Sequence, residues 1–252
     1  MKFKLLKDQS IETMYGKLYR IQAMKSFVDV EKGDIGGYVL CENNLSKQGD
    51  AWVYGNARVY GDARVYGNAQ VYGNARVSED ACVYGDAQVY GEAKVYEGAK
   101  VYGNAQVYGN AWVYGDAQVY GDAKVYGNAQ VYEDVRVYGN AKVYEGARVS
   151  GNACVYGNAC VYEDARVYGN ARVSEDAKIK NTIDFVYLSS LWPITIVRSY
   201  IQIGCKSHTA EKWVNFTDQE ISSMHEKALA WWTEWKPIIL SIHATIKVQK
   251  DE

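Results

Sequence analysis

Histidine is almost absent from this chain: there are 3 in 252 residues, and all of them lie after residue 207. Because histidine is the commonest general acid or base and a frequent metal ligand, most of the chain lacks the usual reagent for either chemistry. Proline occurs only twice. Long hydrophobic runs are missing too: the longest uncharged stretch outside the repeat described below, residues 185–197, is too short to span a bilayer and contains Pro193.

A disulfide framework is not indicated either. The cysteines are odd in number and scattered, which suits a reducing compartment; they are Cys41, Cys82, Cys154, Cys160 and Cys205. The first residues, Met-Lys-Phe-Lys-Leu-Leu-Lys, lack the apolar stretch of a secretory signal. We therefore expect a cytoplasmic protein.

What the chain has in abundance is one hexapeptide. From Val53 to Lys178 the pattern V-Y-G-N-A-R recurs 21 times without an insertion or a deletion. The first position is always Val, and the second is Tyr in 18 units; the exceptions are Ser78, Ser150 and Ser174. Such a period indicates a solenoid, in which each unit buries its apolar face against its neighbours.

The residue types at the other positions predict how the chain turns. Position three is Gly or Glu, position four is Asn, Asp or Gly in every unit except at Glu92, and position five is Ala except at Val135. Because Asn, Asp and Gly tolerate positive φ, we place a left-handed corner at position four. Positions six, one and two then form a short strand whose side chains alternate outward, inward and outward. Val and Ala line the interior, and Tyr and the position-six residue face water.

The array resembles the hexapeptide repeat of left-handed parallel β-helices, the fold of the bacterial hexapeptide acyltransferases. In that family an aliphatic residue opens each hexad and a small residue takes the fifth position, as Val and Ala do here, whereas Tyr-Gly replaces the usual small residue at position two. The variant V-Y-G-N-A-R and its flanks look closer to uncharacterised bacterial and prophage proteins of YdcK type; the flanks are Tyr19-Arg-Ile-Gln-Ala, Lys32-Gly-Asp-Ile-Gly-Gly-Tyr and Ile203-Gly-Cys. The resemblance implies a left-handed coil and a phage or prophage origin.

Three hexapeptides make one triangular coil, and weaker hexads from Ile35 onward extend the array to about eight coils. We therefore predict an all-β fold, a left-handed parallel β-helix over residues 35–184. Residues 1–34 read as a small N-terminal β cap, with Gly16-Lys17 as a turn. Residues 185–252 read as a C-terminal module of strands and a helix that caps the other end.

An amphipathic helix is predicted near the C-terminus. Thr217 and Glu220 form a capping box, and the apolar residues that follow recur at helical spacing. Pro237 should kink or restart this helix. The helix bears an apolar stripe that we expect to be buried, partly on the last coil and partly against a second subunit; it comprises Trp231, Trp235, Ile238 and Ile242, with Trp232 as a third tryptophan of the assembly surface.

The charges of the array separate by position. All 12 Lys and Arg occupy position six on the flat faces, and all 15 Asp and Glu occupy positions three and four on the corners. This mixed surface makes nucleic acid an unexpected partner. One face combines cations with aromatic rings, and we take it as the candidate binding surface; its residues are Tyr60, Tyr96, Tyr114, Tyr132, Arg58, Arg76, Lys94, Trp112, Arg148 and Arg166.

Catalytic signatures are few. Hexapeptide acyltransferases use a histidine that projects from the coils, and this array has none. The remaining candidate pair, Cys205 and His208, reads as a buried cysteine at a strand end and a surface histidine. We assign no catalytic residue, no metal and no cofactor, and expect no membrane partner.

Three functions stay open. The first is a nonenzymatic scaffold or binding protein that presents tyrosine ladders, with a protein partner or a second copy bound through the C-terminal helix. The second is a divergent acyltransferase. The third is a protein that sequesters a nucleotide or a glycan on its aromatic and basic surface.

Overall fold

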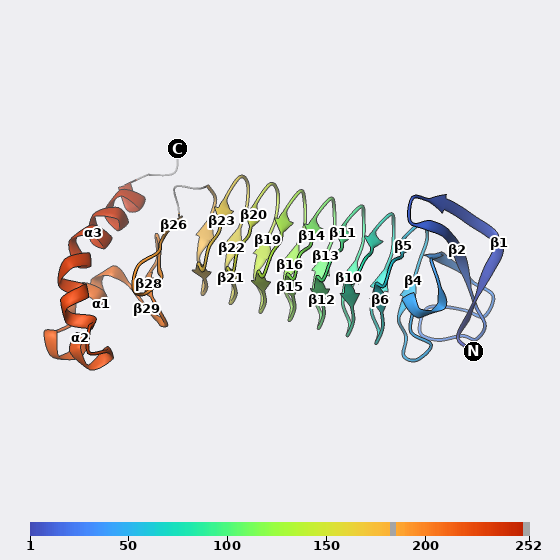
Figure 1. Cartoon of the computed structure of the whole chain (residues 1–252), viewed down its shortest axis with the longest axis horizontal. Helices are drawn as coiled ribbons and strands as arrows, with labels where there is room; N and C mark the ends of the chain where they lie inside the picture. Colours follow the sequence, from blue (N-terminus) through green and yellow to red (C-terminus); the bar gives the residue numbers. More distant parts are fainter. Residues whose placement is uncertain (182–184, 249–252) are drawn as a thin grey trace.

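Pairing between residues 18 positions apart builds the array. In the computed structural model, which describes residues 1–181 and 185–248, Gln88 pairs in parallel with Gln70 on one side and Gln106 on the other. The same register recurs through the array, so three hexapeptides make one coil. The predicted parallel β-solenoid is confirmed, and Figure 1 shows it as a rod with a different cap at each end.

The solenoid has three flat faces, each a parallel sheet of two-residue strands. Face 1 consists of β4 (Trp52–Val53), β7 (Gln70–Val71), β10 (Gln88–Val89), β13 (Gln106–Val107), β16 (Lys124–Val125), β19 (Lys142–Val143), β22 (Cys160–Val161) and β25 (Lys178–Ile179). Face 2 consists of β5 (Arg58–Val59), β8 (Arg76–Val77), β11 (Lys94–Val95), β14 (Trp112–Val113), β17 (Gln130–Val131), β20 (Arg148–Val149) and β23 (Arg166–Val167). Face 3 consists of β6 (Arg64–Val65), β9 (Cys82–Val83), β12 (Lys100–Val101), β15 (Gln118–Val119), β18 (Arg136–Val137), β21 (Cys154–Val155) and β24 (Arg172–Val173).

The interior of the solenoid is lined by two residues of each hexapeptide, as predicted. Every Val at position one and every residue at position five is at most 2% exposed, including Val135 in place of Ala. Burying one Val side chain contributes about 1.5–3 kcal/mol, and repetition of the same interface lets a narrow core hold a long rod together.

The corner of each hexapeptide lies one residue earlier than we predicted. Positive φ occurs at position three, where Gly103, for example, has a φ of 67°, and not at position four. A Cβ built on Gly103 would lie 3.1 Å from the backbone nitrogen of Gly121 in the next coil, so the corner is crowded as well as left-handed. The Asn-rich position four misled the assignment, because tolerance of positive φ does not show that a residue adopts it.

Glutamate replaces Gly at six of these corners and adopts the same conformation, with φ between 53° and 62°. Four of the six carboxylates accept a hydrogen bond from the backbone N–H at the equivalent corner of the next coil. Glu97 Oε2 accepts from Gly115 N at 2.8 Å, and Glu145 Oε2 accepts from Glu163 N at 2.9 Å. Glu79 and Glu133 make the same bond. The bond offsets part of the strain of a left-handed non-Gly residue.

The N-terminal cap continues the sheet of face 2. The strand β1 (Phe3–Thr13) pairs antiparallel with β2 (Gly16–Ala23), β2 pairs antiparallel with β3 (Ile35–Val39), and β3 joins β5 in parallel. The hairpin turn lies at residues 14–15, so Gly16 begins a strand where we had predicted the turn. A short 3₁₀ helix, η1 (Glu42–Asn44), follows. Lys2 reaches into the open end and donates to Ala51 O at 2.6 Å.

An antiparallel sheet, not the terminal helix, closes the other end. It contains β26 (Phe185–Leu188), β27 (Ile194–Val197), β28 (Ile201–Ile203) and β29 (Lys206–His208). Its near side packs on the last coils: Tyr200 Oη accepts from Ser174 N at 2.7 Å and donates to Arg172 O at 3.0 Å. The last three residues of the predicted β-helix, 182–184, lie outside the described residues.

The helices cover the far side of this sheet. They are α1 (Ala210–Asn215), α2 (Asp218–Met224), which begins with the predicted capping box at Thr217, and α3 (Ala228–Val248). Ile194 and Ile196 of β27 pack in the same apolar cluster as Trp232 and Ile239 of α3. The prediction that α3 covers the last coil is therefore wrong, because the alternating strand β27 stands between them.

The helix does not restart at Pro237, one of the two predicted effects of this residue, because α3 runs without a break from Ala228 to Val248 with Pro237 inside it. Its buried side is Trp232, Ile239 and Ile246, whereas Ile238 of the predicted buried stripe is 45% exposed. The periodicity predicted a single helix from Thr217, whereas the structure divides this stretch into α2 and α3. Nor does an apolar helix with few charges by itself reveal which side faces the sheet.

The corner geometry leads to a stability prediction at Gly103. Both Gly103→Ala and Gly103→Lys force a side chain into a crowded left-handed corner, and we expect each to lower the free energy of unfolding. Gly103→Glu should be milder by about 1 kcal/mol, because its carboxylate reaches the N–H of Gly121 as Glu97 reaches Gly115. Chemical denaturation of the three variants checks the order, and a Glu variant no more stable than the Lys variant would contradict it.

Candidate functional site

Face 2 differs from the other two faces in its aromatic ladder. On face 3 the tyrosine rings stack without a gap from Tyr66 to Tyr156, at centroid distances of 4.8–5.1 Å. On face 1 they stack from Tyr72 to Tyr162, while Tyr54 meets Tyr72 edge-on. The predicted ladders are thus confirmed except at this first ring.

The ladder of face 2 is interrupted at two rungs. Tyr96, Tyr114 and Tyr132 stack at 4.9 and 5.0 Å, but Ser78 and Ser150 occupy the ring positions on either side of this run. Ser78 is 6% exposed, whereas Ser150 is half-buried. The difference follows from their surroundings, because the tip of the N-terminal hairpin lies beside Ser78 alone.

A cavity of about 280 Å³ opens at the Ser78 rung. On one side Tyr15 of the hairpin tip stacks on Tyr60 with the ring centroids 4.8 Å apart. On the other, Tyr96 and Trp112 contact edge to face. The full lining is Met14, Tyr15, Tyr60, Arg76, Ser78, Glu79, Lys94, Tyr96 and Trp112. We call this the Ser78 cavity.

A second, more polar cavity of about 320 Å³ adjoins it along the cation column. Arg58, Arg76 and Lys94 project from consecutive strands of face 2 and line it together with Asn56, Asn74 and Glu92. A third cavity, of about 210 Å³, is shared between the hairpin and Arg58, Tyr60 and Arg76. Arg76 therefore belongs to all three cavities, which form one continuous surface.

The charge of the three cations is not neutralised by ion pairs. Within residues 1–181 and 185–248, no carboxylate lies within ion-pair distance of Arg58, Arg76 or Lys94. Lys94 Nζ instead lies 4.0 Å from the centroid of the Trp112 ring, a cation–π contact. These side chains can therefore turn toward an anionic ligand without first breaking a salt bridge.

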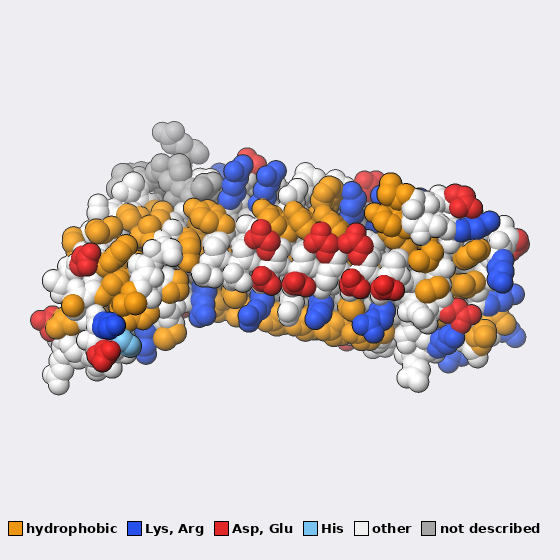
Figure 2. Space-filling model, viewed as in Figure 1, with side chains coloured by type: hydrophobic (Ala, Val, Ile, Leu, Met, Phe, Trp, Pro, Cys, Tyr) orange, Lys and Arg blue, Asp and Glu red, His pale blue; other side chains and the backbone are white. Residues whose placement is uncertain are grey.

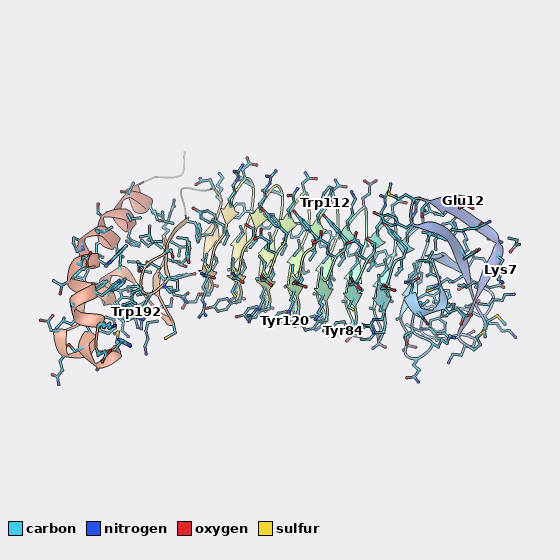
Figure 3. The ribbon with its side chains drawn as sticks, in the orientation of Figure 1. Lys7, Glu12, Tyr84, Trp112, Tyr120 and Trp192 are labelled. Atoms are coloured by element: carbon cyan, nitrogen blue, oxygen red, sulfur yellow. The ribbon has the colours of Figure 1, made fainter. Side chains whose placement is uncertain are left out.

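The structure gathers some of the predicted binding residues and separates others. Six of them line the three cavities: Tyr60, Tyr96, Arg58, Arg76, Lys94 and Trp112. Tyr114 and Tyr132 continue the ladder, and Arg148 and Arg166 lie on β20 and β23 at the far end of face 2. Figure 3 shows Trp112 on the same side of the rod as Glu12 of the hairpin, with Tyr84 and Tyr120 of face 3 opposite.

Sequence reasoning missed the hairpin's part of the site. Met14 and Tyr15 reach the solenoid because β1 and β2 extend the sheet of face 2. The hairpin lies outside the repeat, so the repeat pattern could not predict this contact. Ser78 was a usable signal: a small residue in a column of tyrosines leaves room for another segment. Ser174 shows the same effect at the other end, where Tyr200 covers it.

The histidines occupy packing and surface positions. His208 is half-buried beside Trp213 and Phe216, and burial, followed by Lys212 and Lys206, lowers its pKa from the ordinary value. His225 is exposed and accepts from Lys227 N. Cys205 is exposed, so its predicted burial is wrong. Within the described residues no group of three or more His, Cys, Asp and Glu is placed to hold a metal.

The tryptophans of α3 separate into two environments. Trp232 is 5% exposed and packs on Trp213, whereas Trp231 and Trp235 are half-buried and stack on each other at 5.7 Å. Trp231 also lines an apolar cavity of about 270 Å³ together with Trp192 and Trp213. Trp232 therefore belongs to the module's own core, and only Trp231 and Trp235 of the three tryptophans stay predicted assembly residues.

The repeat matches a known family of β-solenoid repeats. The family model described as the YdcK beta solenoid repeat matches the chain at residues 51–67, 69–85, 99–115, 105–121, 117–133, 147–163 and 165–178. No curated protein matches the chain. Over residues 1–181 and 185–248, the structure contains no helix whose length and hydropathy suit a membrane span.

Ladder burial leads to a prediction about alkaline pH. Burial, followed by the neighbouring Tyr114, Glu97 and Glu79, raises the pKa of Tyr96 from 10 to about 12. Since the folded state favours the neutral phenol, this contribution to stability is complete below pH 10 and is lost as the pH rises through 12. A spectrophotometric titration should show ladder tyrosines ionising well above pH 10, together with alkaline unfolding. Ionisation of all tyrosines near pH 10 in the folded protein would contradict the prediction.

Proposed function

The solenoid of this chain belongs to the YdcK β-solenoid repeat family, and we propose that the protein is a nonenzymatic binding scaffold whose ligand surface is face 2. The rod supplies a rigid support, because each strand bonds to the coils before and after it. The ligand surface is the end of face 2 nearest the hairpin, where the three cavities meet.

The observation that carries the proposal is the meeting of aromatic rings and free cations at the Ser78 cavity. Faces 1 and 3 bear longer ladders, but their rings stack on one another and shield the strands below, which is a structural role. Face 2 alone combines an interrupted ladder, a hairpin folded over it and three cations on consecutive strands. Concave sites with a few convergent polar groups are the usual form of a ligand site.

The acid and base chemistry of a hexapeptide acyltransferase has no counterpart on this surface. The Ser78 cavity is lined by cations, rings and the single carboxylate of Glu79. That carboxylate already accepts from Glu97 N at 3.1 Å. A ligand there is held by stacking and charge, which supports binding in place of turnover.

The net charge of the rod supports a selective surface instead of a general anion binder. The whole chain has a formal charge of −2, and rows of Asp and Glu run along a corner of the solenoid between the basic side chains in Figure 2. Anions are therefore repelled from the corners and attracted only where cations cluster on a face. The cytoplasmic location and the phage or prophage origin predicted from the sequence stay predictions.

Ligand retention with matched charge variants tests the proposed function. The variant Arg58→Gln/Arg76→Gln/Lys94→Gln removes three cations from face 2. The control Arg64→Gln/Lys100→Gln/Arg136→Gln removes three from the equivalent position of face 3. We expect compounds that co-purify with the wild-type and control proteins, detected by native mass spectrometry, to be lost from the face 2 variant. Identical retention by all three proteins would overturn the assignment of the surface.

A second copy of the chain is the partner that we propose for α3. Trp231, Trp235, Ile238 and Ile242 recur at helical spacing on a side of α3 that the sheet leaves half-buried or exposed. We expect Ile238→Lys to shift the protein toward the monomer in light scattering. Ala244→Lys, about 120° away around the helix, should leave the mass unchanged. A wild-type protein that is already monomeric would contradict this assembly.

A further inference from the structure

The C-terminal module contains an apolar cavity that lies apart from face 2. It has a volume of about 270 Å³ and lies where the turn between β28 and β29 meets the three helices. Figure 3 labels Trp192 in this module, at the opposite end of the rod from the hairpin of β1 and β2. We call it the tryptophan cavity, because four tryptophans line it: Trp192, Trp213, Trp231 and Trp232.

The walls of the tryptophan cavity are held in place by contacts within the module. Trp213 Nε1 donates to a backbone carbonyl of β28 at 2.8 Å, and its ring packs on Trp232 with the centroids 5.3 Å apart. Trp192 meets Trp231 edge to face at 5.1 Å. The left-handed φ of 56° at Gly204 closes the turn beside Trp192. A ligand therefore enters a largely preformed site, and little side-chain ordering accompanies binding.

The size and the walls of the cavity favour a planar aromatic ring. An apolar cavity of about 150 Å³ admits benzene, so the larger tryptophan cavity can hold a bicyclic ring. Aromatic rings pack in offset-stacked and edge-to-face arrangements, and four indoles around one space offer both faces and edges. Met224 adds a thioether to the wall, which also makes favourable contacts with aromatic rings.

The polar side chains of the cavity wall are donors or carry positive charge. They belong to Cys205, Lys206 and His225, and no Asp or Glu is among the lining residues. His225 Nδ1 accepts from Lys227 N at 3.1 Å, so Nε2 carries the proton of the neutral ring and is a donor. Lys206 is exposed, and within residues 1–181 and 185–248 no carboxylate lies within ion-pair distance of it.

Two carboxylates lie next to the cavity wall in sequence, and neither pairs with Lys206. Glu220 precedes Ile221 of the wall, but its Oε2 accepts from Thr217 N at 2.8 Å and from Thr217 Oγ1 at 2.9 Å. Glu226 is exposed, and Lys227 follows it directly. Lys206 is thus the charged side chain that an entering ligand meets.

We propose that the tryptophan cavity binds an aromatic monocarboxylate, with its ring among the tryptophans and its carboxylate at Lys206. The proposal goes beyond the proposed function, because it uses no residue of face 2. Cations also bind over tryptophan rings, but an aromatic amine is disfavoured here, since Lys206 repels it and the wall offers no carboxylate.

Calorimetric titration of the whole chain with three compounds that share one ring tests the charge preference. The compounds are indole-3-acetate, indole and tryptamine. We expect indole-3-acetate to bind about fivefold more tightly than indole, since one partly exposed charge pair contributes about 1 kcal/mol, and tryptamine to bind more weakly than indole. Lys206→Gln should remove the preference for the acetate. The control Lys212→Gln removes a cation of α1 that does not line the cavity, and should keep the preference.

A second pair of variants tests the location. Ala228 is a buried wall residue at the start of α3, so Ala228→Leu places a larger side chain in the cavity and should weaken binding of indole and indole-3-acetate about tenfold or more. Ala230→Leu makes the same change at an exposed position of α3 and should bind both compounds as the wild type does. Circular dichroism and thermal unfolding check that both variants fold.

Three results would overturn the inference. The first is failure of indole-3-acetate to bind, or binding no tighter than that of tryptamine. The second is a preference for the acetate that Lys206→Gln leaves intact. The third is an equal effect, or no effect, of Ala228→Leu and Ala230→Leu, because the ligand would then lie elsewhere. None of these variants alters face 2, so retention by the face 2 charge variants tests the proposed function separately.

Discussion

The parallel hydrogen-bond register between residues 18 positions apart is the constraint on which the rest of the molecule depends. It brings each position-two residue over the equivalent residue of the next coil, so tyrosines separated by three hexapeptides in sequence become stacked rings in space. The same register aligns cations with cations along a face. Like charges directly opposite each other are unfavourable, and on face 2 Trp112 and Gln130 separate the two groups of basic residues. Each coil thus contributes one position-two residue and one position-six residue to each face, and these residues can differ from coil to coil.

Sequence reasoning recovered the architecture because an unbroken period of six carries redundant information. The inward Val and Ala, the outward Tyr and the capping box at Thr217 follow from patterns that repeat or from local hydrogen bonding. The corner was placed one residue late because Asn and Asp at position four and Gly at position three are both turn formers. The position-three glutamates, which read as exceptions in the sequence, are stabilised by a bond to the next coil.

The sequence predicts only the part of the candidate site that lies within the repeat, because the rest depends on how nonrepetitive segments pack. Columns on a face follow from the repeat length, so the sequence alone aligns Arg58, Arg76 and Lys94. The approach of Met14 and Tyr15 depends on how a nonrepetitive hairpin packs, and the burial side of α3 depends on the sheet between that helix and the last coil. Both are tertiary contacts between segments without periodicity, for which a single sequence supplies no register.

Because three hexapeptides make one coil, the length of the rod and the relative orientation of its two caps can change independently. Gain or loss of 18 residues in the repetitive stretch changes the spacing between the caps by one rung and leaves every column on its own face. Gain or loss of 6 residues turns the C-terminal module by a third of a revolution relative to the hairpin and moves each later column to the neighbouring face. A change of one whole coil therefore keeps the relative orientation of the two caps, whereas a change of one hexapeptide does not.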